Sequence, residues 1–240
     1  MADPIVWPTA VLPPQSIMFS RQTMSRSGGQ SVSGVEQVVM SSADRWRAKL
    51  VTKITRMEQA LAFRAMMAAA DGRAGTWMVP TCSGFQRLGP SVKGVFPAIG
   101  VTTIVNAPFS DAATFDDTGT FETKTVMGIV SVPASIRSRS ISVQMTTDVA
   151  QNPIAGHYFS IGQALYVIAT SDPDPSETPG LYTLTFRPGL RVAAAQGDVV
   201  DFSRPACRMR LASDDSGELS LDQLRFATVS LDFVEDAQTT

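Results

Sequence analysis

The sequence offers few residues with which to build a catalytic centre. Its 240 residues include one histidine, His157, and two cysteines, Cys82 and Cys207. A serine or cysteine nucleophile needs a neighbouring base, and His157 is the one imidazole that can serve as that base. It follows Gly156 directly, and the chain has no G-x-S-x-G elbow that would present a serine beside it. These residues predict that the protein is not an enzyme.

Metal and phosphate sites have equally weak signals. A structural zinc site requires four Cys or His ligands, whereas this chain has three such residues, scattered along its length. The two cysteines are expected to be reduced, buried thiols rather than a disulfide. The segment Gly84–Gly89 has glycines at both ends, but Pro90 follows where a phosphate-binding loop needs lysine. We therefore expect no metal and no cofactor.

Five acidic residues gather in two expected loops. Asp172, Asp174 and Glu177 lie in a proline-stiffened stretch, and Asp116 and Asp117 begin another turn. Calcium takes about six to eight oxygen ligands, and these loops lack the glycine pivot and the alternating ligands of a calcium loop. A solvated hairpin tip accounts better for them. A pair of glycosidase carboxylates stays open, because distances in space are not visible in the sequence.

The clearest pattern in the chain runs from Arg45 to Ile54. Apolar residues and one threonine occupy alternate positions, and four cations, Arg45, Arg47, Lys49 and Lys53, lie between them. This alternation predicts an antiparallel strand with one wet face. Nucleic-acid binding is disfavoured, because the net charge is −2 and no basic residues elsewhere reinforce the stripe. We expect a solvated face or a salt-bridged contact between subunits.

One helix is predicted, from Arg56 to about Ala70. Thr55 is its expected N-cap, and Glu58 follows three residues later, as in a capping box. Asp71-Gly72 is expected to end it, with the glycine in the left-handed conformation. Its three methionines are expected to fill the core.

The other signals are those of short β-strands. The expected strands are 35–40, 45–54, 76–79, 126–132, 141–145, 156–169 in two pieces around Gly162, 182–186, 207–211 and 227–233. Short strands separated by Gly, Pro and Asp turns are typical of sandwiches and small barrels. We predict a mainly β protein, a β-sandwich with one substantial α-helix plus an inserted small β-barrel-like domain. Residues 1–125 with 206–240 would form the first domain and 126–205 the insertion, so that the strand at 227–233 returns to the N-terminal sheet.

The N-terminal segment is expected to be extended. Residues 1–20 are apolar but interrupted by prolines, which exclude a helix. Two interpretations stay open: a strand lying on its own domain, or an arm docking onto a neighbouring subunit. Gly28-Gly29 is expected to form a turn, and residues 80–122 a long connection. We see no secretory signal and no apolar run near the roughly 18 residues of a membrane-spanning helix, so we expect a protein that is made and left in the cytoplasm, or built into something assembled there, without membrane insertion.

Two stretches of the chain together resemble a known family. Residues 29–79 contain GQSVSGVEQVV, Arg45-Trp46, Arg64 in the helix and GRAGT. Residues 156–211 contain GHYFSIG, LYVI, LYTL, RPGLR, GDVV and RPACRMRL. They resemble the structural tail proteins of long-tailed, siphovirus-type bacteriophages, in the role of the distal tail protein.

The resemblance implies a component of the virion tail without sequence-specific nucleic-acid recognition. Identical copies would form a homo-oligomeric, hexameric ring that joins the tail tube to the tail tip or baseplate, in contact with tube and hub proteins. A closed ring needs two different complementary patches, and the basic stripe together with the acidic loops is one candidate pair. The alternative is a host-carbohydrate or receptor-binding β-module of the tail tip, for which we expect exposed Trp and Tyr rings.

Overall fold

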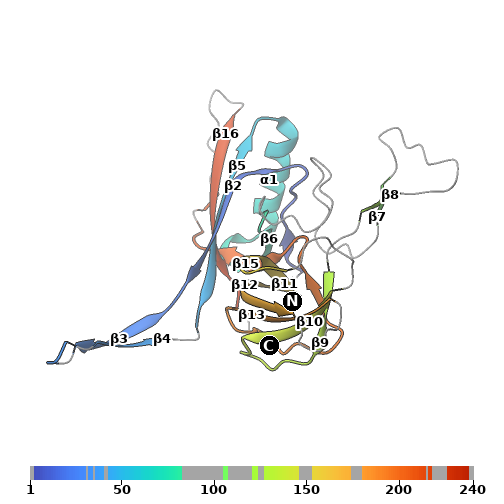
Figure 1. The fold of residues 1–240 in the computed structure, drawn as a ribbon. Helices are drawn as coiled ribbons and strands as arrows, with labels where there is room; N and C mark the ends of the chain where they lie inside the picture. The colour runs from blue at the N-terminus through green and yellow to red at the C-terminus, as the bar shows by residue number, and fades with distance from the viewer. Residues whose placement is uncertain are drawn as a thin grey trace.

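The computed structural model describes residues 3–30, 32–34, 36–40, 43–82, 105–107, 121–123, 127–145, 153–173, 180–214, 216–217 and 226–237. Strands dominate it, with one α-helix, a six-stranded sheet and a closed six-stranded barrel (Figure 1). The predicted mainly β fold class is confirmed. Within the described part of the chain, no helix has the length and apolar composition needed to cross a membrane.

The main sheet has the strand order β1-β6-β15-β16-β5-β2. Its strands are β1 (Ile5–Val6), β2 (Pro14–Gln22), β5 (Arg45–Ile54), β6 (Trp77–Pro80), β15 (Ala206–Leu211) and β16 (Ala227–Glu235). The last strand pairs with β5 from Ala227 opposite Ile54 to Val234 opposite Arg47, which confirms that the chain returns to the N-terminal sheet.

Alternation along β5 divides this sheet into two faces. Side chains at even positions, from Trp46 to Ile54, are buried, and the four cations between them are exposed. The buried positions of β15 and β16 face the same core, which also includes Phe63 of the helix and Leu165 of the barrel. Full burial of one large apolar side chain contributes about 1.5–3 kcal/mol. The inner face therefore holds the sheet, helix and barrel together.

Helix α1 (Met57–Ala69) covers part of the inner face, with Arg56 rather than Thr55 as its N-cap. Gln59, not Glu58, closes the first turn, because its Oε1 accepts the backbone N–H groups of Thr55 at 2.9 Å and Arg56 at 3.2 Å. With Arg56 as the N-cap, Gln59 and not Glu58 occupies the third helical position, whose side chain reaches back to the N-cap. One of the three methionines, Met57, is 76% exposed, so the prediction that it fills the core is wrong.

The helix ends as expected, through two residues with positive φ. Asp71 has φ 47° and Gly72 has φ 62°, and a short 3₁₀ turn, η1 (Gly72–Ala74), leads into β6. Glycine adopts this conformation without the steric cost that a side chain brings.

The barrel closes in the order β10-β13-β12-β11-β14-β9. Its strands are β9 (Met127–Val132), β10 (Ser140–Met145), β11 (Tyr158–Ile161), β12 (Ala164–Pro173), β13 (Leu181–Arg187) and β14 (Val199–Asp201). Phe159 lies at the centre of its core, with ring centroids 5.3 Å from Tyr166 and 5.4 Å from Phe186. In chain order these strands fall between β8 and β15. The exact domain boundaries at 126 and 205 stay predictions.

Two further pairs of strands form separate two-stranded sheets. They are β3 (Ser25–Gln30) with β4 (Glu36–Met40), and β7 (Val105–Ala107) with β8 (Phe121–Thr123). The β3–β4 hairpin, which we call the arm, continues β2 and β5 and projects away from the sheet and the barrel (Figure 1). Gly28 and Gly29 lie within β3, so the turn expected there is wrong; the chain reverses between Gln30 and Glu36.

The N-terminal segment lies on its own domain, the first of the two interpretations. Trp7 and Leu12 are buried in the main core, and the Trp7 indole N–H donates to the Leu12 carbonyl at 2.9 Å. Strand β1 pairs in parallel with β6, and β2 pairs with β5. The projecting element of this protein is therefore the arm and not its first 20 residues.

Candidate functional site

The histidine and the two cysteines of the chain lie in buried or partly buried positions. The backbone N–H of Ile154 donates to Nδ1 of His157 at 3.5 Å, and burial lowers the pKa of the imidazole. Both cysteines are free. Burial raises the pKa of Cys207 well above the ordinary value, and burial also raises the pKa of Cys82 against the opposing charge of Arg204. A thiol kept protonated is a poor nucleophile.

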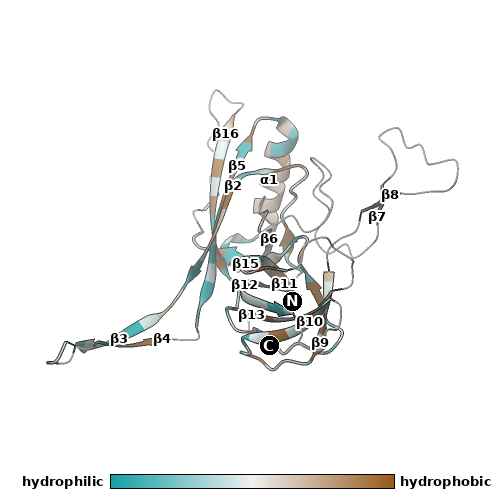
Figure 2. Ribbon diagram, in the orientation of Figure 1, coloured by the Kyte–Doolittle hydropathy of each residue, from teal (hydrophilic) through white to brown (hydrophobic). Residues whose placement is uncertain are grey.

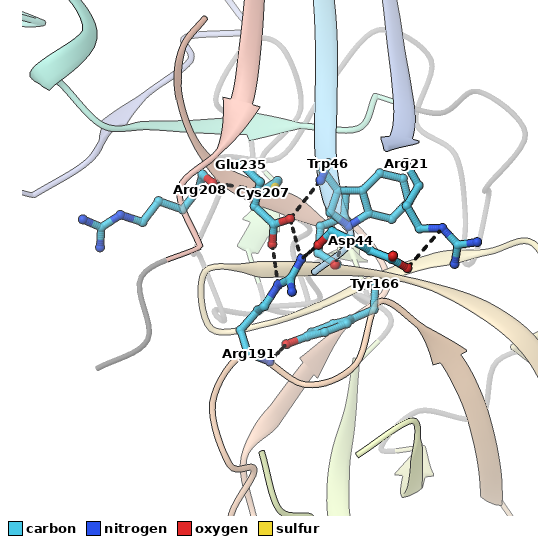
Figure 3. Close-up of polar contacts among 9 residues, drawn as sticks. Arg21, Asp44, Trp46, Tyr166, Arg191, Cys207, Arg208 and Glu235 are labelled. Atoms are coloured by element: carbon cyan, nitrogen blue, oxygen red, sulfur yellow. Dashed lines mark hydrogen bonds and ion pairs between the residues drawn. The ribbon is translucent and has the colours of Figure 1, made fainter. Parts of the chain in front are cut away.

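The described residues contain no group of three or more His, Cys, Asp or Glu side chains placed to hold a metal ion. The most connected polar group instead joins the sheet to the barrel, and we call it the joint: Asp44, Trp46, Tyr166, Arg191 and Glu235 (Figure 3). Strand β5, strand β16, strand β12 and the segment after β13 each supply part of it. These segments meet only in the folded protein.

An ion pair forms the centre of the joint. Arg191 donates from Nε to Oε1 of Glu235 at 2.8 Å and from Nη2 to Oε2 at 2.7 Å. Nη2 also donates to the carbonyl of Asp44, and the backbone N–H of Arg191 donates to the Tyr166 hydroxyl at 3.1 Å. Both carboxylate oxygens are thus bound by one guanidinium, the geometry in which such pairs are strongest.

Trp46 completes the joint from the sheet side. Its backbone N–H donates to Oε2 of Glu235 at 2.8 Å, and its indole N–H donates to the carbonyl of Leu165 at 2.8 Å. Its ring also contacts Phe19 and Tyr158, with centroids 6.3 Å and 5.8 Å away. One residue therefore bonds to the barrel and packs on β2 through its side chain, and binds the buried carboxylate through its backbone N–H.

Electrostatics agree with a structural role for the joint. Burial alone lowers the pKa of Arg191, but its hydrogen bonds and charge interaction with Glu235 outweigh that effect and raise it. Burial raises the pKa of Tyr166 to about 12. The tyrosine is therefore neutral and the arginine charged throughout the physiological range, so neither of these two side chains changes charge near pH 7.

A cavity of about 500 Å³ lies beside the joint. Its barrel wall includes Ile161, Ala164 and Val199, and its sheet wall includes Arg208 and Asp236. Two of the charged residues that line it pair with each other, Arg208 Nε lying 3.0 Å from Oδ2 of Asp236. The cavity is thus mostly apolar, and the charges on its wall already have partners.

The structure places the predicted contact residues in different regions. Arg45, Arg47, Lys49 and Lys53 form an exposed row on the outer face of the sheet. Asp172 is exposed near the end of β12 in the barrel. The other four predicted acids, Asp116, Asp117, Asp174 and Glu177, lie outside the described residues. Pairing between the basic row and the acidic loops therefore stays a prediction.

Sequence reasoning missed two cations of the same face. Arg210 of β15 lies opposite Val234 of β16, which lies opposite Arg47 of β5. Arg208 lies two positions before Arg210 and so shares its face. The expectation that no basic residues reinforce the stripe is therefore wrong. The alternation at 207–211 marks both arginines as outward-facing, but only the strand order shows which strands they lie beside.

No protein-family model and no curated protein sequence matches this chain. The surfaces that a partner could contact are the arm, the open edges of the sheet, the outer sheet face and the cavity beside the joint.

Proposed function

We propose that the protein is a structural component of a phage tail, in which identical copies form a ring that joins the tail tube to the tail tip. The resemblance of residues 29–79 and 156–211 to distal tail proteins supports this role and implies six copies and contacts with tube and hub proteins. The observation that carries the proposal is the arm, because it is built to be covered by another protein chain.

The arm cannot be stable through its own contacts. All six residues of β3 are exposed, and the hairpin side chains that the structure describes belong to neither core. An isolated two-stranded hairpin is marginally stable at best in water. Val38 and Val39 are 58% and 60% exposed, and consecutive strand residues point to opposite faces. Both faces of the arm therefore present apolar surface to a partner.

Backbone groups along the sheet edge add to this surface. Strand β2 has a neighbour on one side only, so its outer edge presents unpaired N–H and C=O groups. The arm continues from that strand, so edge and hairpin form one extended contact surface. When such a surface binds a different patch on the next copy, repetition of the contact closes a ring if the rotation allows it.

The mass of the purified protein tests this proposal. We expect light scattering after size exclusion to give a single multiple of the 25.7 kDa subunit. Replacing residues 25–40 with Asn-Gly, which favours a tight hairpin, removes the arm while β2 and β5 stay joined. This variant should be a folded monomer, because the sheet, helix and barrel keep their cores.

A matched control keeps the arm and changes an exposed apolar residue elsewhere. Val132→Ser alters a barrel side chain that is 56% exposed and should leave the oligomer intact. A monomeric full-length protein at high concentration would contradict the ring, and a shortened variant that still assembles would contradict the role of the arm.

The alternative function, a carbohydrate-binding module, lacks the tryptophan part of its expected stacking platforms; Tyr158 and Tyr182 are partly exposed. The three tryptophans of the chain, Trp7, Trp46 and Trp77, are each at most 3% exposed. None of them offers a ring face to a sugar.

A further inference from the structure

The outer face of the six-stranded sheet concentrates positive charge. Strand β5 contributes four cations and β15 contributes two. Two acids lie on the same face, one on β16 and one just after it. These residues are Arg45, Arg47, Lys49, Lys53, Arg208, Arg210, Asp232 and Asp236. Six positive and two negative charges give this face +4, whereas the whole chain carries −2, so the rest of the chain carries −6.

The two acids neutralise only part of the face. Asp236 lies 3.0 Å from Nε of Arg208 and 3.0 Å from Nε of Arg210, so these three residues together keep one positive charge. Asp232 lies directly opposite Lys49 in the β5–β16 register. Arg45, Arg47 and Lys53 are exposed beyond these pairs. The excess charge therefore lies along β5.

Polar side chains and three apolar ones lie between the cations: Met18 is exposed opposite Lys49, and Val51 and Val234 are partly buried. Thr228 and Ser230 of β16 and Ser20 of β2 are exposed on this face, and Gln22 is partly exposed. Protein interfaces are centred on aromatic and apolar side chains and are depleted in lysine. Arginine, lysine, serine, threonine and glutamine are the side chains that contact nucleic-acid phosphates.

We propose that this face binds the sugar–phosphate backbone of a nucleic acid without reading its bases. Alternate residues of β5 lie about 7 Å apart, and the strand extends for about 33 Å, so the cations form a row rather than a point. The outer sheet face, at +4 in a chain of net charge −2, is therefore a side that attracts a polyanion. This goes beyond the proposed ring and does not depend on it, because one subunit carries the whole face.

The expected binding is weak, non-specific and sensitive to salt. Contacts with about four phosphates give a slope near −4 in a plot of log affinity against log salt concentration. Dissociation constants of about 10⁻⁴ to 10⁻⁶ M are typical of binding of this kind at physiological salt.

Fluorescence anisotropy with a labelled random-sequence DNA duplex of about 20 base pairs tests the proposal, using the full chain between about 50 and 200 mM salt. Arg47→Glu with Lys49→Glu should weaken binding at least about tenfold and reduce the salt slope by about 2. The control, Arg64→Glu with Arg137→Glu, changes the net charge equally at two exposed positions on the helix and the barrel. It should alter affinity by less than about twofold.

Three results would overturn the proposal. They are no binding at the lowest salt, an equal loss in the control pair, and equally tight binding of polyglutamate of the same charge. The last would assign the face to an acidic protein surface, such as the acidic loops of another copy. Light scattering on the same samples keeps the two proposals separate: a ring that does not bind DNA defeats this inference alone, and a monomer that binds DNA defeats the ring alone.

Discussion

In the barrel, every strand has two hydrogen-bonded neighbours, whereas the main sheet ends in β1 and β2, which have one neighbour each. The barrel strands enclose an aromatic core, while the arm that continues the sheet exposes both of its faces. Hydropathy colouring shows the same contrast, with apolar residues on the arm where no core lies beneath them (Figure 2). The barrel strands are all paired within the chain, whereas the sheet leaves two edges that other copies would cover in the proposed ring.

The largest expected effect comes from the joint that connects these two regions. Glu235→Ala leaves the Arg191 guanidinium and the Trp46 N–H without their buried acceptor. We expect the free energy of unfolding to fall by about 3–5 kcal/mol, the usual cost of breaking a buried ion pair on one side. Urea denaturation measures it. Asp232→Ala, at an exposed position of the same strand, should change the free energy of unfolding by less than about 0.5 kcal/mol. A loss as large as that of Glu235→Ala would mean that the joint stabilises the protein no more than an exposed position does.

A smaller side chain in the barrel core tests how much the packing of that core contributes to the free energy of unfolding. Leu184 is fully buried in the barrel core, and Leu184→Ala should cost about 2–5 kcal/mol through lost burial and the cavity left behind. Thermal and urea unfolding measure the loss. Val132→Ala on the outside of the same barrel serves as its control. A cost below about 1 kcal/mol at Leu184 would mean that the barrel core is loosely packed.

Alkaline pH should weaken the joint from the barrel side. The pKa of Tyr166 is about 12 in the folded protein, against 10.0 for an ordinary tyrosine. The folded state therefore holds this proton more tightly, and the associated stability is complete below pH 10 and is lost as pH rises toward 12. This loss amounts to about 2–3 kcal/mol.

Tyr166→Phe isolates that contribution. The variant loses the acceptor for the Arg191 backbone N–H, so it should be less stable than the parent at pH 7. Between pH 10 and 12, however, its unfolding free energy should fall less steeply than that of the parent. Parallel pH profiles for the two proteins would show that Tyr166 ionises equally easily when folded and unfolded.

The smallest expected effect on the subunit lies in the arm. Val38→Ser with Val39→Ser should change the free energy of unfolding of a monomeric subunit by less than about 0.5 kcal/mol, since both side chains are exposed. The same pair should reduce assembly, which sedimentation at a series of concentrations measures. A strong loss of subunit stability would place these valines in a core, against the contrast drawn above.

Local patterns predicted the elements whose residues alternate clearly. The buried and exposed positions of β5 and the strand at 227–233 follow from alternation alone. Strand β14 was missed because its three residues are too few to show a period. The helix N-cap was misplaced by one residue, because Gln59 and Glu58 both lie within reach of the first turn and only the folded geometry selects between them.

The joint had no comparable signal in the sequence. Arg191 and Glu235 are 44 residues apart and belong to different regions, so neither residue's neighbours along the chain indicate the other. Burial of Glu235 follows from its place on β16, but its partner depends on how the barrel sits on the sheet. Likewise, only the strand order, with β16 between β15 and β5, shows that the cations of β15 and β5 lie on one face.

The continuity of the arm with β5 has a mechanical consequence (Figure 1). Strand β5 is hydrogen-bonded on both sides, to β16 and to β2, and its bonds lie across the strand direction. Tension applied to the arm by a neighbouring molecule would pull β5 along its own length, loading many of these bonds at once in shear. The sheet would then resist such a force far better than a hairpin that is peeled open one bond at a time.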